Sequence, residues 1–352
     1  MKKILLIHDN FYLGSKCGGP YNSVKALYIE LSKYFIVEIL THKTGAIKFE
    51  KFNLVYENTV NFNKYHSIIL NSFFSISTFK VFLKRHNASI VIIPRGELMK
   101  GVLRQNTFKF YKKFIFIFLF KCLTFFSNKK WELAGTNDFE LNEIEMEFGR
   151  GNYLIIPNSS QINKIYPINI SNYKSALEIL RIVYFSRIDR KKNLEFTFLV
   201  LSKSNRKIQF DIFGESIDPG YFEELLCLAK QYSSDKLNVR FYGHENFENF
   251  EAKSNMYNLA VLHSIGENYS HSIVEMFYLG IPILISDNTP WRFLKEKGLG
   301  WDLALDVNKH LDIINNFETK IQEVNLNSEI RTKVLTDLST LTTYDKLINF
   351  LT

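Results

Sequence analysis

Short apolar runs alternate with helical stretches in two parts of this 352-residue chain. The first run, Ile4–His8, leads through a glycine-rich turn into an amphipathic stretch at Ser23–Tyr34, and a second run follows at Ile36–Leu40. A strand, a glycine turn, a helix and a second strand in this order form the opening of a doubly wound parallel sheet. Because the chain is also long for one hydrophobic core, we predict an α/β protein with two Rossmann-like, doubly wound domains.

Further apolar runs extend the pattern on both sides of a polar stretch at residues 161–177. In the first half, strands are predicted at Ser67–Leu70, Ser89–Ile93 and Tyr153–Ile156. In the second half, strands are predicted at Leu180–Phe185, Ile208–Phe213, Val239–Tyr242, Leu259–His263 and Ile281–Ser286, and helices at Leu194–Ser202 and Tyr221–Tyr232. The predicted division is a first domain over 1–165, a linker over 166–178, a second domain over 179–327 and a C-terminal helical segment over 328–352.

The net charge indicates which kinds of partner the protein binds, and the cysteine content indicates in which compartment it works. The formal net charge of +8 favours an anionic partner, which leaves a nucleotide diphosphate, an anionic lipid surface or nucleic acid. Cys17, Cys122 and Cys227 lie far apart and form no C-x-x-C pair, so neither a disulfide framework nor a zinc site is predicted. The apolar run near Met1 is too short for a signal peptide, and we expect a cytoplasmic protein.

Two carboxylates, Glu267 and Glu275, flank the start of a predicted short helix that ends at Gly280. Ser270 or Ser272 is the candidate cap of this helix. Glu267 therefore lies on the loop before the helix and Glu275 on the helix itself. The loop residues next to the helix are Asn268, Tyr269 and Ser270. Exposed N–H groups there, together with the positive end of the helix dipole, suit an anion such as a diphosphate. The alternative interpretation is an ordinary solvated helix face.

A basic loop follows the predicted strand at Leu180–Phe185 and contains Arg187, Arg190, Lys191 and Lys192. Ligands of open α/β sheets collect at the carboxyl ends of the strands, which is where this loop lies. Arg187 offers a planar fork and Lys192 a compact charge, and both suit phosphate oxygens. Arg190 and Lys191 are expected to be solvated. A wet basic surface without function is the alternative interpretation of the whole loop.

Two other turns are candidate binding elements. Gly18 and Gly19 precede the first helix, where glycine lets backbone N–H groups approach a phosphate. This turn is not G-x-G-x-x-G, which disfavours a nicotinamide dehydrogenase. Arg95 and Glu97 follow the strand at Ser89–Ile93, where an ordinary loop ion pair is the alternative to a functional role.

The spacing of the two glutamates resembles the E-x7-E element of the retaining nucleotide-sugar glycosyltransferases of family 4. The likeness includes Ser264, the downstream Gly280-Ile-Pro282 and Thr289-Pro290-Trp291, and the pair Arg187 and Lys192. That family has the GT-B architecture, in which two Rossmann-like domains face each other across a cleft and the C-terminal helix packs back on the first domain.

The resemblance assigns roles to the candidate residues. Glu267 is expected to contact the transferred sugar, Glu275 the nucleotide ribose, and Arg187 and Lys192 the donor diphosphate, with Glu267, Arg187 and Lys192 as the catalytic set. The other donor-side candidates are Gly18, Gly19, Gly214, His244, Asn268, Tyr269 and Ser270. The Pro94-Arg95-Gly96 stretch resembles an element of a subgroup that makes surface polysaccharides, and many relatives carry a histidine where Arg95 stands. The acceptor-side candidates are Arg95, Glu97 and Asn158.

The function expected from this resemblance is transfer of a sugar from a nucleoside diphosphate sugar, with retention of anomeric configuration and without a metal or other cofactor. The expected acceptor is a saccharide or lipid-linked saccharide of bacterial lipopolysaccharide, O-antigen, capsule or exopolysaccharide biosynthesis. The alternatives are a GT-B epimerase or phosphorylase, and a basic module that binds membrane or nucleic acid without catalysis. No nucleic-acid partner is expected under the main hypothesis.

The segment Phe108–Phe126 is unusually rich in phenylalanine. Its uncharged core, Phe114–Phe120, is far shorter than the ~20 residues needed to span a bilayer. The flanking lysines are Lys109, Lys112, Lys113 and Lys121. This pattern is typical of an interfacial helix on anionic lipid, which would place the protein peripherally on the inner face of the plasma membrane. The alternative is a helix whose apolar side packs on the first sheet.

Overall fold

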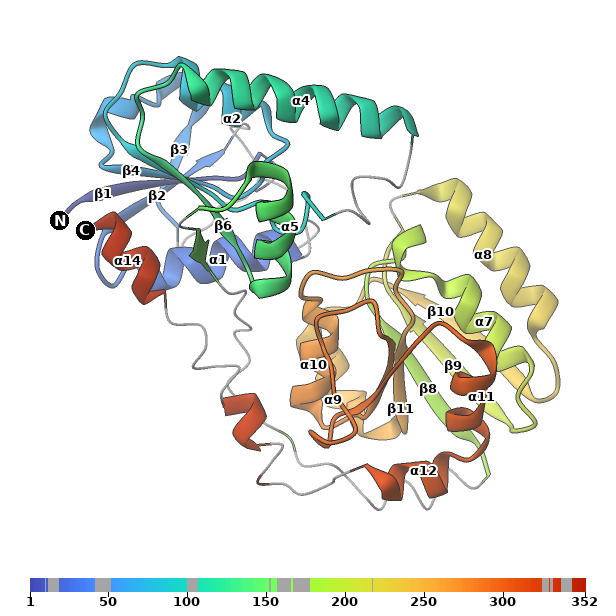
Figure 1. Ribbon diagram of the computed structural model, residues 1–352. Helices are drawn as coiled ribbons and strands as arrows, with labels where there is room; N and C mark the ends of the chain where they lie inside the picture. Colours follow the sequence, from blue (N-terminus) through green and yellow to red (C-terminus); the bar gives the residue numbers. More distant parts are fainter. Residues whose placement is uncertain are drawn as a thin grey trace. The chain divides into compact units, whose positions relative to one another are not determined.

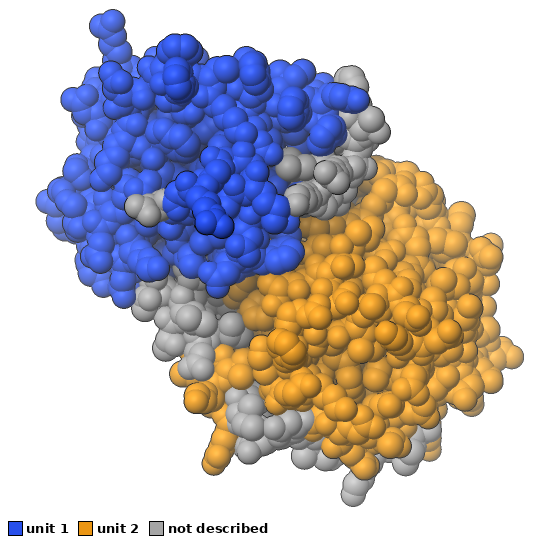
Figure 2. Space-filling model, in the orientation of Figure 1, with its two compact units in different colours: residues 1–161, 340–352 blue, residues 162–339 orange. Residues whose placement is uncertain are grey.

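The computed structural model describes residues 1–9, 11, 19–41, 52–99, 107–151, 153–156, 166, 178–216, 218–324, 329, 332–336 and 344–352. They belong to two compact units, a first unit of residues 1–161 with 340–352 and a second unit of residues 162–339, which Figure 2 shows in blue and orange. Each unit is built on its own parallel sheet. Of the linker predicted at 166–178, only Tyr166 and Glu178 lie within the described residues.

The first unit contains a seven-stranded sheet in the order β3-β2-β1-β4-β5-β6-β7. Its strands are β1 (Lys3–Ile7), β2 (Ile36–Thr41), β3 (Leu54–Tyr56), β4 (Ser67–Leu70), β5 (Ser89–Ile92), β6 (Trp131–Gly135) and β7 (Leu154–Ile155). All neighbours run parallel, and Ile4 of β1 lies opposite Val37 on one side and Ser67 on the other. The strand order reverses between β1 and β4, so that β2 and β3 lie on one side of this pair and β5, β6 and β7 on the other.

Helices cover both faces of the first sheet (Figure 1). They are α1 (Gly19–Leu31), α2 (Ile76–Leu83), α4 (Thr107–Phe125), α5 (Asp138–Phe148) and α14 (Asp345–Leu351). Alternate residues of each strand point to opposite faces. One face, represented by Ile4, packs with residues of α1 and α14, including Leu347. The other face, represented by Leu5, packs with residues of α2, α4 and α5, including Phe120. The C-terminal helix thus contributes to the core of the first unit.

The second unit contains a six-stranded parallel sheet in the order β10-β9-β8-β11-β12-β13. Its strands are β8 (Leu180–Phe185), β9 (Ile208–Phe213), β10 (Leu237–Gly243), β11 (Leu259–Leu262), β12 (Ile283–Ser286) and β13 (Gly300–Leu303). Its α-helices are α7 (Leu194–Ser202), α8 (Pro219–Tyr232), α9 (Phe247–Lys253), α10 (His271–Leu279), α11 (Val307–Asn315) and α12 (Phe317–Glu323). The strand order reverses between β8 and β11, so this sheet too has a topological switch point.

Several boundaries differ from the sequence prediction for local reasons. Strand β12 begins at Ile283 rather than Ile281, because the N–H of Ile281 bonds to the carbonyl of Met276 at the end of α10 and Pro282 has no N–H to donate. Strands β3, β6 and β13 were not predicted. β3 is a three-residue edge strand, and β6 contains Glu132 within its apolar run. The C-terminal segment predicted as helix is helical at residue 329, at residues 332–336 and in α14.

Candidate functional site

The charged loops singled out by the sequence lie at the switch point of the second sheet. The basic loop follows β8 and the loop with Glu267 follows β11, and these two strands are parallel neighbours on which the order reverses. Backbone contacts join the two loops: the N–H of Ile265 donates to the carbonyl of Lys191 at 2.8 Å, and the side-chain amide of Asn193 donates to the carbonyl of His263 at 3.2 Å. Such a position is the usual ligand site of an open α/β sheet.

The basic loop folds into a single 3-10 turn, Arg190–Lys192, between β8 and α7. The carboxylate of Asp189 caps this turn by accepting the N–H of Lys191 at 3.0 Å. Asn193 then adopts a left-handed conformation with φ of 55° and leads into α7. This tight reversal directs the side chain of Lys192 into the unit, where it is buried.

Lys192 and Glu267 form a buried ion pair at the centre of the site. The ammonium nitrogen Nζ lies 2.7 Å from Oε1 of Glu267, and the two side chains are 11% and 8% exposed. Burial by itself would raise the pKa of Glu267, but the positive charges of Lys192 and Lys191 outweigh burial and hold this pKa below its usual value. The pair therefore carries two opposite charges where a ligand can meet both.

The other cations of the loop differ in exposure. Arg187 is about half exposed, and its guanidinium lies 3.3 Å from the carboxylate of Asp189. Arg190 points to the surface and pairs with Glu224 at 2.7 Å, as expected for a solvated residue. Lys191 was also expected to be solvated, and this prediction was wrong because its side chain is half-buried. Burial lowers the pKa of Lys191, and the nearby Glu267 carboxylate only partly offsets the effect.

The loop that carries Glu267 is held from several sides. The N–H of Glu267 donates to the carbonyl of Asn288 at 3.1 Å, and the hydroxyl of Ser286 donates to the carbonyl of Ser264. The indole N–H of Trp291 donates to the carbonyl of Tyr269, and the two rings lie 5.3 Å apart. These contacts fix the backbone between β11 and α10 without using the Glu267 carboxylate.

Helix α10 begins directly after this loop, at His271. Ser270 occupies the N-cap position with φ of 59°, and its side chain makes no capping hydrogen bond. The prediction of a serine side-chain cap was therefore wrong. The first N–H groups of the helix are not capped by the Ser270 hydroxyl, and their partial positive charge lies next to Glu267 in the chain.

Glu275 lies on α10 between buried apolar residues, including Val274 and Met276. Burial raises the pKa of Glu275 to about 7, and the negative charge of Glu248 adds to this effect. Its carboxyl group can therefore be protonated or ionised near neutral pH. In either state it has an oxygen that accepts a hydrogen bond from a hydroxyl group.

Gly214 and His244 follow β9 and β10 at the same edge of the sheet. The N–H of Gly214 donates to the carbonyl of Gly243 at 2.7 Å, which joins the two strand ends. A Cβ atom on Gly214 would lie 1.9 Å from the carbonyl oxygen of Ser186, so only glycine fits here. His244 is exposed. The donor-side candidates of the second unit thus lie on or next to the carboxyl edge of one sheet. They are Arg187, Lys192, Gly214, His244, the loop 267–270 and Glu275.

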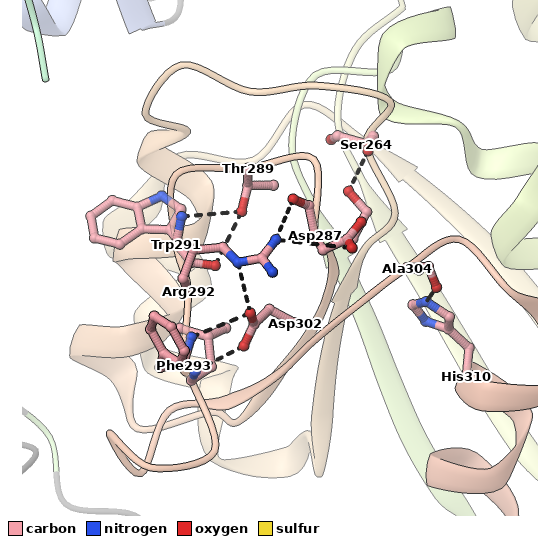
Figure 3. Close-up of polar contacts among 11 residues, drawn as sticks. Ser264, Asp287, Thr289, Trp291, Arg292, Phe293, Asp302, Ala304 and His310 are labelled. Atoms are coloured by element: carbon pink, nitrogen blue, oxygen red, sulfur yellow. Dashed lines mark hydrogen bonds and ion pairs between the residues drawn. The ribbon is translucent and has the colours of Figure 1, made fainter. Parts of the chain in front are cut away.

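A second loop, between β12 and β13, supports Trp291 (Figure 3). The guanidinium of Arg292 donates to the carbonyl of Asp287 at 2.6 Å and lies 3.3 Å from the carboxylate of Asp302. Asp302 also accepts the N–H groups of Phe293 and Leu294, at 3.2 and 2.9 Å. Figure 3 shows the side chain of Arg292 between Asp287 and Asp302. The local sequence Thr289-Pro290-Trp291 was the only signal for this support.

In the first unit, Arg95 and Glu97 follow β5 but do not form the loop ion pair considered above. Nε of Arg95 donates to the side-chain oxygen of Asn71 at 2.9 Å. Glu97 instead accepts the hydroxyl of Ser72 at 2.8 Å and the N–H groups of Phe73 and Phe74 at 2.6 and 3.1 Å. Burial raises the pKa of Glu97, although these hydrogen bonds oppose the change.

Two polar residues near Arg95, His8 and Asn71, were not found by sequence reasoning. His8 follows β1 and Asn71 follows β4, at the switch point of the first sheet, and Nδ1 of His8 lies 3.2 Å from the carbonyl of Asn71. Glu140 is fully buried and accepts the N–H groups of Gly96 and Thr136. The signal available in the sequence was the polar residue at the end of each predicted strand. Gly19 begins α1, while Gly18 and Asn158 lie outside the described residues.

Comparisons with known proteins agree with this architecture. Residues 170–293 match the family model described as "Glycosyl transferases group 1". No curated protein sequence matches the chain. Among solved structures, HepE of Anabaena in complex with UDP and glucose is similar with a TM-score of 0.76 at 15% identity, covering 100% of this chain and 99% of that one.

Two further structures show the same fold. TarM of S. aureus, in a mutant complex with fondaparinux, alpha-GlcNAc-glycerol and UDP, is similar with a TM-score of 0.75 at 12% identity, and both chains are covered completely. The lipopolysaccharide outer core galactosyltransferase WaaB in its apo form is similar with a TM-score of 0.67 at 14% identity, covering 99% of this chain and 98% of that one.

The two parallel sheets and these likenesses show that the chain has the GT-B fold. The match to the group 1 glycosyltransferases covers about a third of the chain, within the second unit.

Proposed function

We propose that this protein transfers a sugar from a nucleoside diphosphate sugar to a hydroxyl group of a saccharide or lipid-linked saccharide, with retention at the anomeric carbon. The proposed pathway is the biosynthesis of a bacterial surface polysaccharide, such as lipopolysaccharide, O-antigen, capsule or exopolysaccharide. The observation that carries the proposal is the buried pair of Lys192 and Glu267 at the switch point, beside the start of α10. Structures of the same fold that were solved with UDP-glucose or UDP support the choice of donor.

The site offers separate groups for each part of the donor. Arg187, Lys192 and the first N–H groups of α10 would bind the diphosphate, since an arginine fork, an ammonium group and a helix N-terminus all favour phosphate oxygens. Lys192 can keep its bond to Glu267 while it binds phosphate, because an ammonium group has three N–H donors. Glu267 would orient the sugar, and Glu275 would accept the ribose hydroxyls. Gly214 and His244 lie at the strand ends proposed to face the nucleoside.

The proposed reaction breaks the bond between the anomeric carbon and the diphosphate oxygen and forms a bond from the same carbon to the acceptor oxygen. The proton of the acceptor hydroxyl passes to the departing phosphate oxygen on the same face of the sugar, so no enzymic nucleophile is required. Negative charge grows on the diphosphate as it leaves, and preoriented positive charges stabilise it. Arg187 and Lys192 would supply this stabilisation, and we propose that no metal ion is needed.

The acceptor would be bound by residues of the first unit. The candidates from the sequence are Arg95, Glu97 and Asn158, and the described structure adds His8 and Asn71 beside Arg95. Arg95 brings a positive charge to this group, which suits a phosphate of a lipid-linked acceptor as well as saccharide hydroxyls. The specificity for the donor and the specificity for the acceptor would then depend on residues of different units.

The experiment that tests the donor site compares two lysine–glutamate pairs. Lys192→Ala and Glu267→Ala are assayed beside Lys295→Ala, because Lys295 pairs with Glu323 at 2.9 Å on the exposed surface of the same unit. A panel of UDP-, GDP-, ADP- and dTDP-sugars first identifies the donor by the rise in melting temperature of the wild type. We expect sugar transfer to fall at least about 100-fold in both buried-pair variants and to stay unchanged in Lys295→Ala.

Two results would defeat the proposal. One is wild-type turnover in both Lys192→Ala and Glu267→Ala. The other is a donor-dependent product without a new glycosidic bond, such as an epimerised nucleotide sugar, which would place the protein among the alternative GT-B enzymes.

A further inference from the structure

The outer side of α4 carries large apolar side chains that the first unit does not bury. Ile117 and Phe120 point inward and belong to the core, where the ring of Phe120 lies 4.9 Å from that of Phe73. Six other side chains of the helix are at least half exposed: Tyr111, Phe114, Ile115, Phe118, Leu119 and Phe125. The predicted packing of one apolar side of the helix on the sheet is therefore confirmed, and the opposite side of the helix is exposed.

The exposed residues form one continuous stripe. At about 100° of rotation per residue, all six fall within an arc of about 140° on the helix surface. Figure 1 shows α4 as a long helix on the outside of the first unit, next to α2. A stripe of six large apolar groups is more than the scattered exposed hydrophobics that a soluble surface normally carries. We define these six residues as the α4 stripe.

The charges around the α4 stripe identify the partner. The helix contains four lysines and no aspartate or glutamate. By the same rotation, Lys112 and Lys121 fall about 20° beyond the two edges of the stripe, one on each side. Both side chains are exposed, and Lys121 is anchored by Glu147 at 2.8 Å. Lysines in this position can reach lipid phosphates while the apolar groups between them enter the acyl region.

We propose that the first unit docks on an anionic lipid bilayer through the α4 stripe, with the helix lying in the plane of the interface and Lys112 and Lys121 at the headgroups. A bilayer accepts irregular apolar side chains without shape complementarity, and anionic headgroups match the positive borders. In the described part of the chain, no helix has the length and hydropathy needed to cross a membrane. Docking on the surface is the mode that the one-sided stripe and its lysines favour, and the 19 residues of α4 would extend about 28 Å along the membrane plane.

The first experiment measures binding of the full-length protein to vesicles. Phosphatidylcholine vesicles with and without about one third phosphatidylglycerol are sedimented with the wild type, with the double variant Ile115→Ser/Phe118→Ser and with a matched control, Ile29→Ser/Tyr34→Ser. The control changes an aliphatic and an aromatic residue of similar exposure at α1, on the other face of the sheet. We expect the stripe variant to lose roughly tenfold or more in partitioning, and the control to bind like the wild type.

The two lysines at the edges of the α4 stripe are tested separately. Lys112→Gln and Lys121→Gln are each expected to weaken binding to the anionic vesicles roughly five-fold, with little effect on binding to neutral vesicles. Equal weakening on both kinds of vesicle would contradict the assigned role of the lysines.

A second experiment uses cysteines that the protein already has. Cys122 is exposed and falls within the arc of the α4 stripe, whereas Cys227 is exposed on α8 of the second unit. Two variants, each with Cys17 and one of these two cysteines replaced by serine, are labelled at the remaining cysteine with a polarity-sensitive fluorophore. On addition of anionic vesicles we expect a blue shift at Cys122 and none at Cys227.

Three results would overturn the proposal: equal vesicle binding by the stripe variant and the control, a shift at Cys227 without one at Cys122, or a change of the stripe variant from dimer to monomer without any change in vesicle binding. The last result would make the stripe an interface between copies of this chain. The donor-induced rise in melting temperature is measured in the same variants. It depends on the second unit, so failure of the membrane proposal is distinguishable from failure of the proposed function.

Discussion

At the switch point of the second sheet, Lys192 and Glu267 meet as a buried pair of opposite charges, whereas the corresponding point of the first sheet brings together His8, Asn71 and the guanidinium of Arg95. Both groups lie at the carboxyl ends of two neighbouring strands between which the strand order reverses, so the fold provides the position in each case. The chemistry differs because the loops differ. The second sheet presents fixed charges next to a helix N-terminus, while the first presents mainly hydrogen-bonding groups.

This difference fits a division of work between the units. A diphosphate leaving group gains negative charge during the reaction and needs fixed positive charge, whereas a hydroxylated acceptor needs directional hydrogen bonds. The glutamates of the two units illustrate the contrast. Glu267 keeps its carboxylate for Lys192, and the backbone contacts of its loop hold it in place. Glu97 uses its carboxylate to bind two N–H groups and a hydroxyl of the loop after β4.

The largest expected effect compares these two glutamates directly. Glu267→Gln removes the charge that pairs with Lys192, and we expect kcat for transfer to fall at least about 100-fold while the donor Kd changes only a few-fold. Glu97→Gln weakens the hydrogen bonds that hold the loop after β4, so we expect the KM for the acceptor to rise roughly tenfold with a smaller change in kcat. Steady-state kinetics with both substrates varied measure all these quantities. The opposite pattern, with the larger loss of kcat in Glu97→Gln, would break the proposed division.

A second prediction concerns the backbone at the two carboxyl edges. Gly214 follows β9 in the second sheet, and Gly135 ends β6 in the first. A Cβ on Gly214 would collide with the carbonyl of Ser186 at 1.9 Å, whereas on Gly135 it would mainly meet the side-chain end of Leu141 at 2.7 Å. Backbone moves less easily than a leucine rotamer. We therefore expect Gly214→Ala to reduce the free energy of unfolding by about 3 kcal/mol or more and Gly135→Ala by about 1 kcal/mol.

Denaturant unfolding monitored by circular dichroism checks these values. Gly220→Ala is a useful control, because Gly220 lies in the first turn of α8 and a Cβ there would approach Asp218 only to 3.4 Å. Alanine is the better helix former, so this variant is expected to be neutral or more stable by up to about 1 kcal/mol. Equal losses in Gly214→Ala and Gly135→Ala would show that the edge of the second sheet is less rigid than the contacts indicate.

The two charged loops of the candidate site could be located from the sequence because their charges are local. Arg187 and Lys192 occupy one loop, and Glu267 and Glu275 flank the start of one helix, so each half of the site has its own short pattern. The pairing of Lys192 with Glu267 spans 75 residues and follows only from the strand order. A short sequence pattern cannot predict an ion pair between residues so far apart in the chain.

The first unit was harder to predict for the same physical reason. His8, Asn71 and Arg95 follow three separate strands and Glu140 lies in the first turn of α5, so they meet only when the sheet is assembled. For α4, apolar residues occur all around the helix, so periodicity could not separate the packed side from the exposed one. Contact with Phe73 and its neighbours in the core decides that Phe120 points inward.

The smallest expected effect is a difference in pH dependence between the two switch points. The pKa of Glu275 rises from 4.5 to about 7 in the folded protein, so the folded state holds its proton more tightly than the unfolded state does. Stability from this group is present below pH ~4.5 and is lost as the pH rises towards 7, at a cost of about 1–3 kcal/mol once the partial exposure of the side chain is allowed for.

For His8 the pH dependence of stability has the opposite sign. Burial lowers its pKa below 6.5, so the stability that it contributes falls on acidification through that range. The free energy of unfolding of Glu275→Gln and His8→Gln is measured against the wild type between pH 5 and 8. We expect the difference for Glu275→Gln to grow in favour of the variant as the pH rises, and the difference for His8→Gln to grow in favour of the variant as the pH falls. Parallel curves for both variants would mean that the two switch points share one electrostatic character, contrary to the contrast drawn between the units.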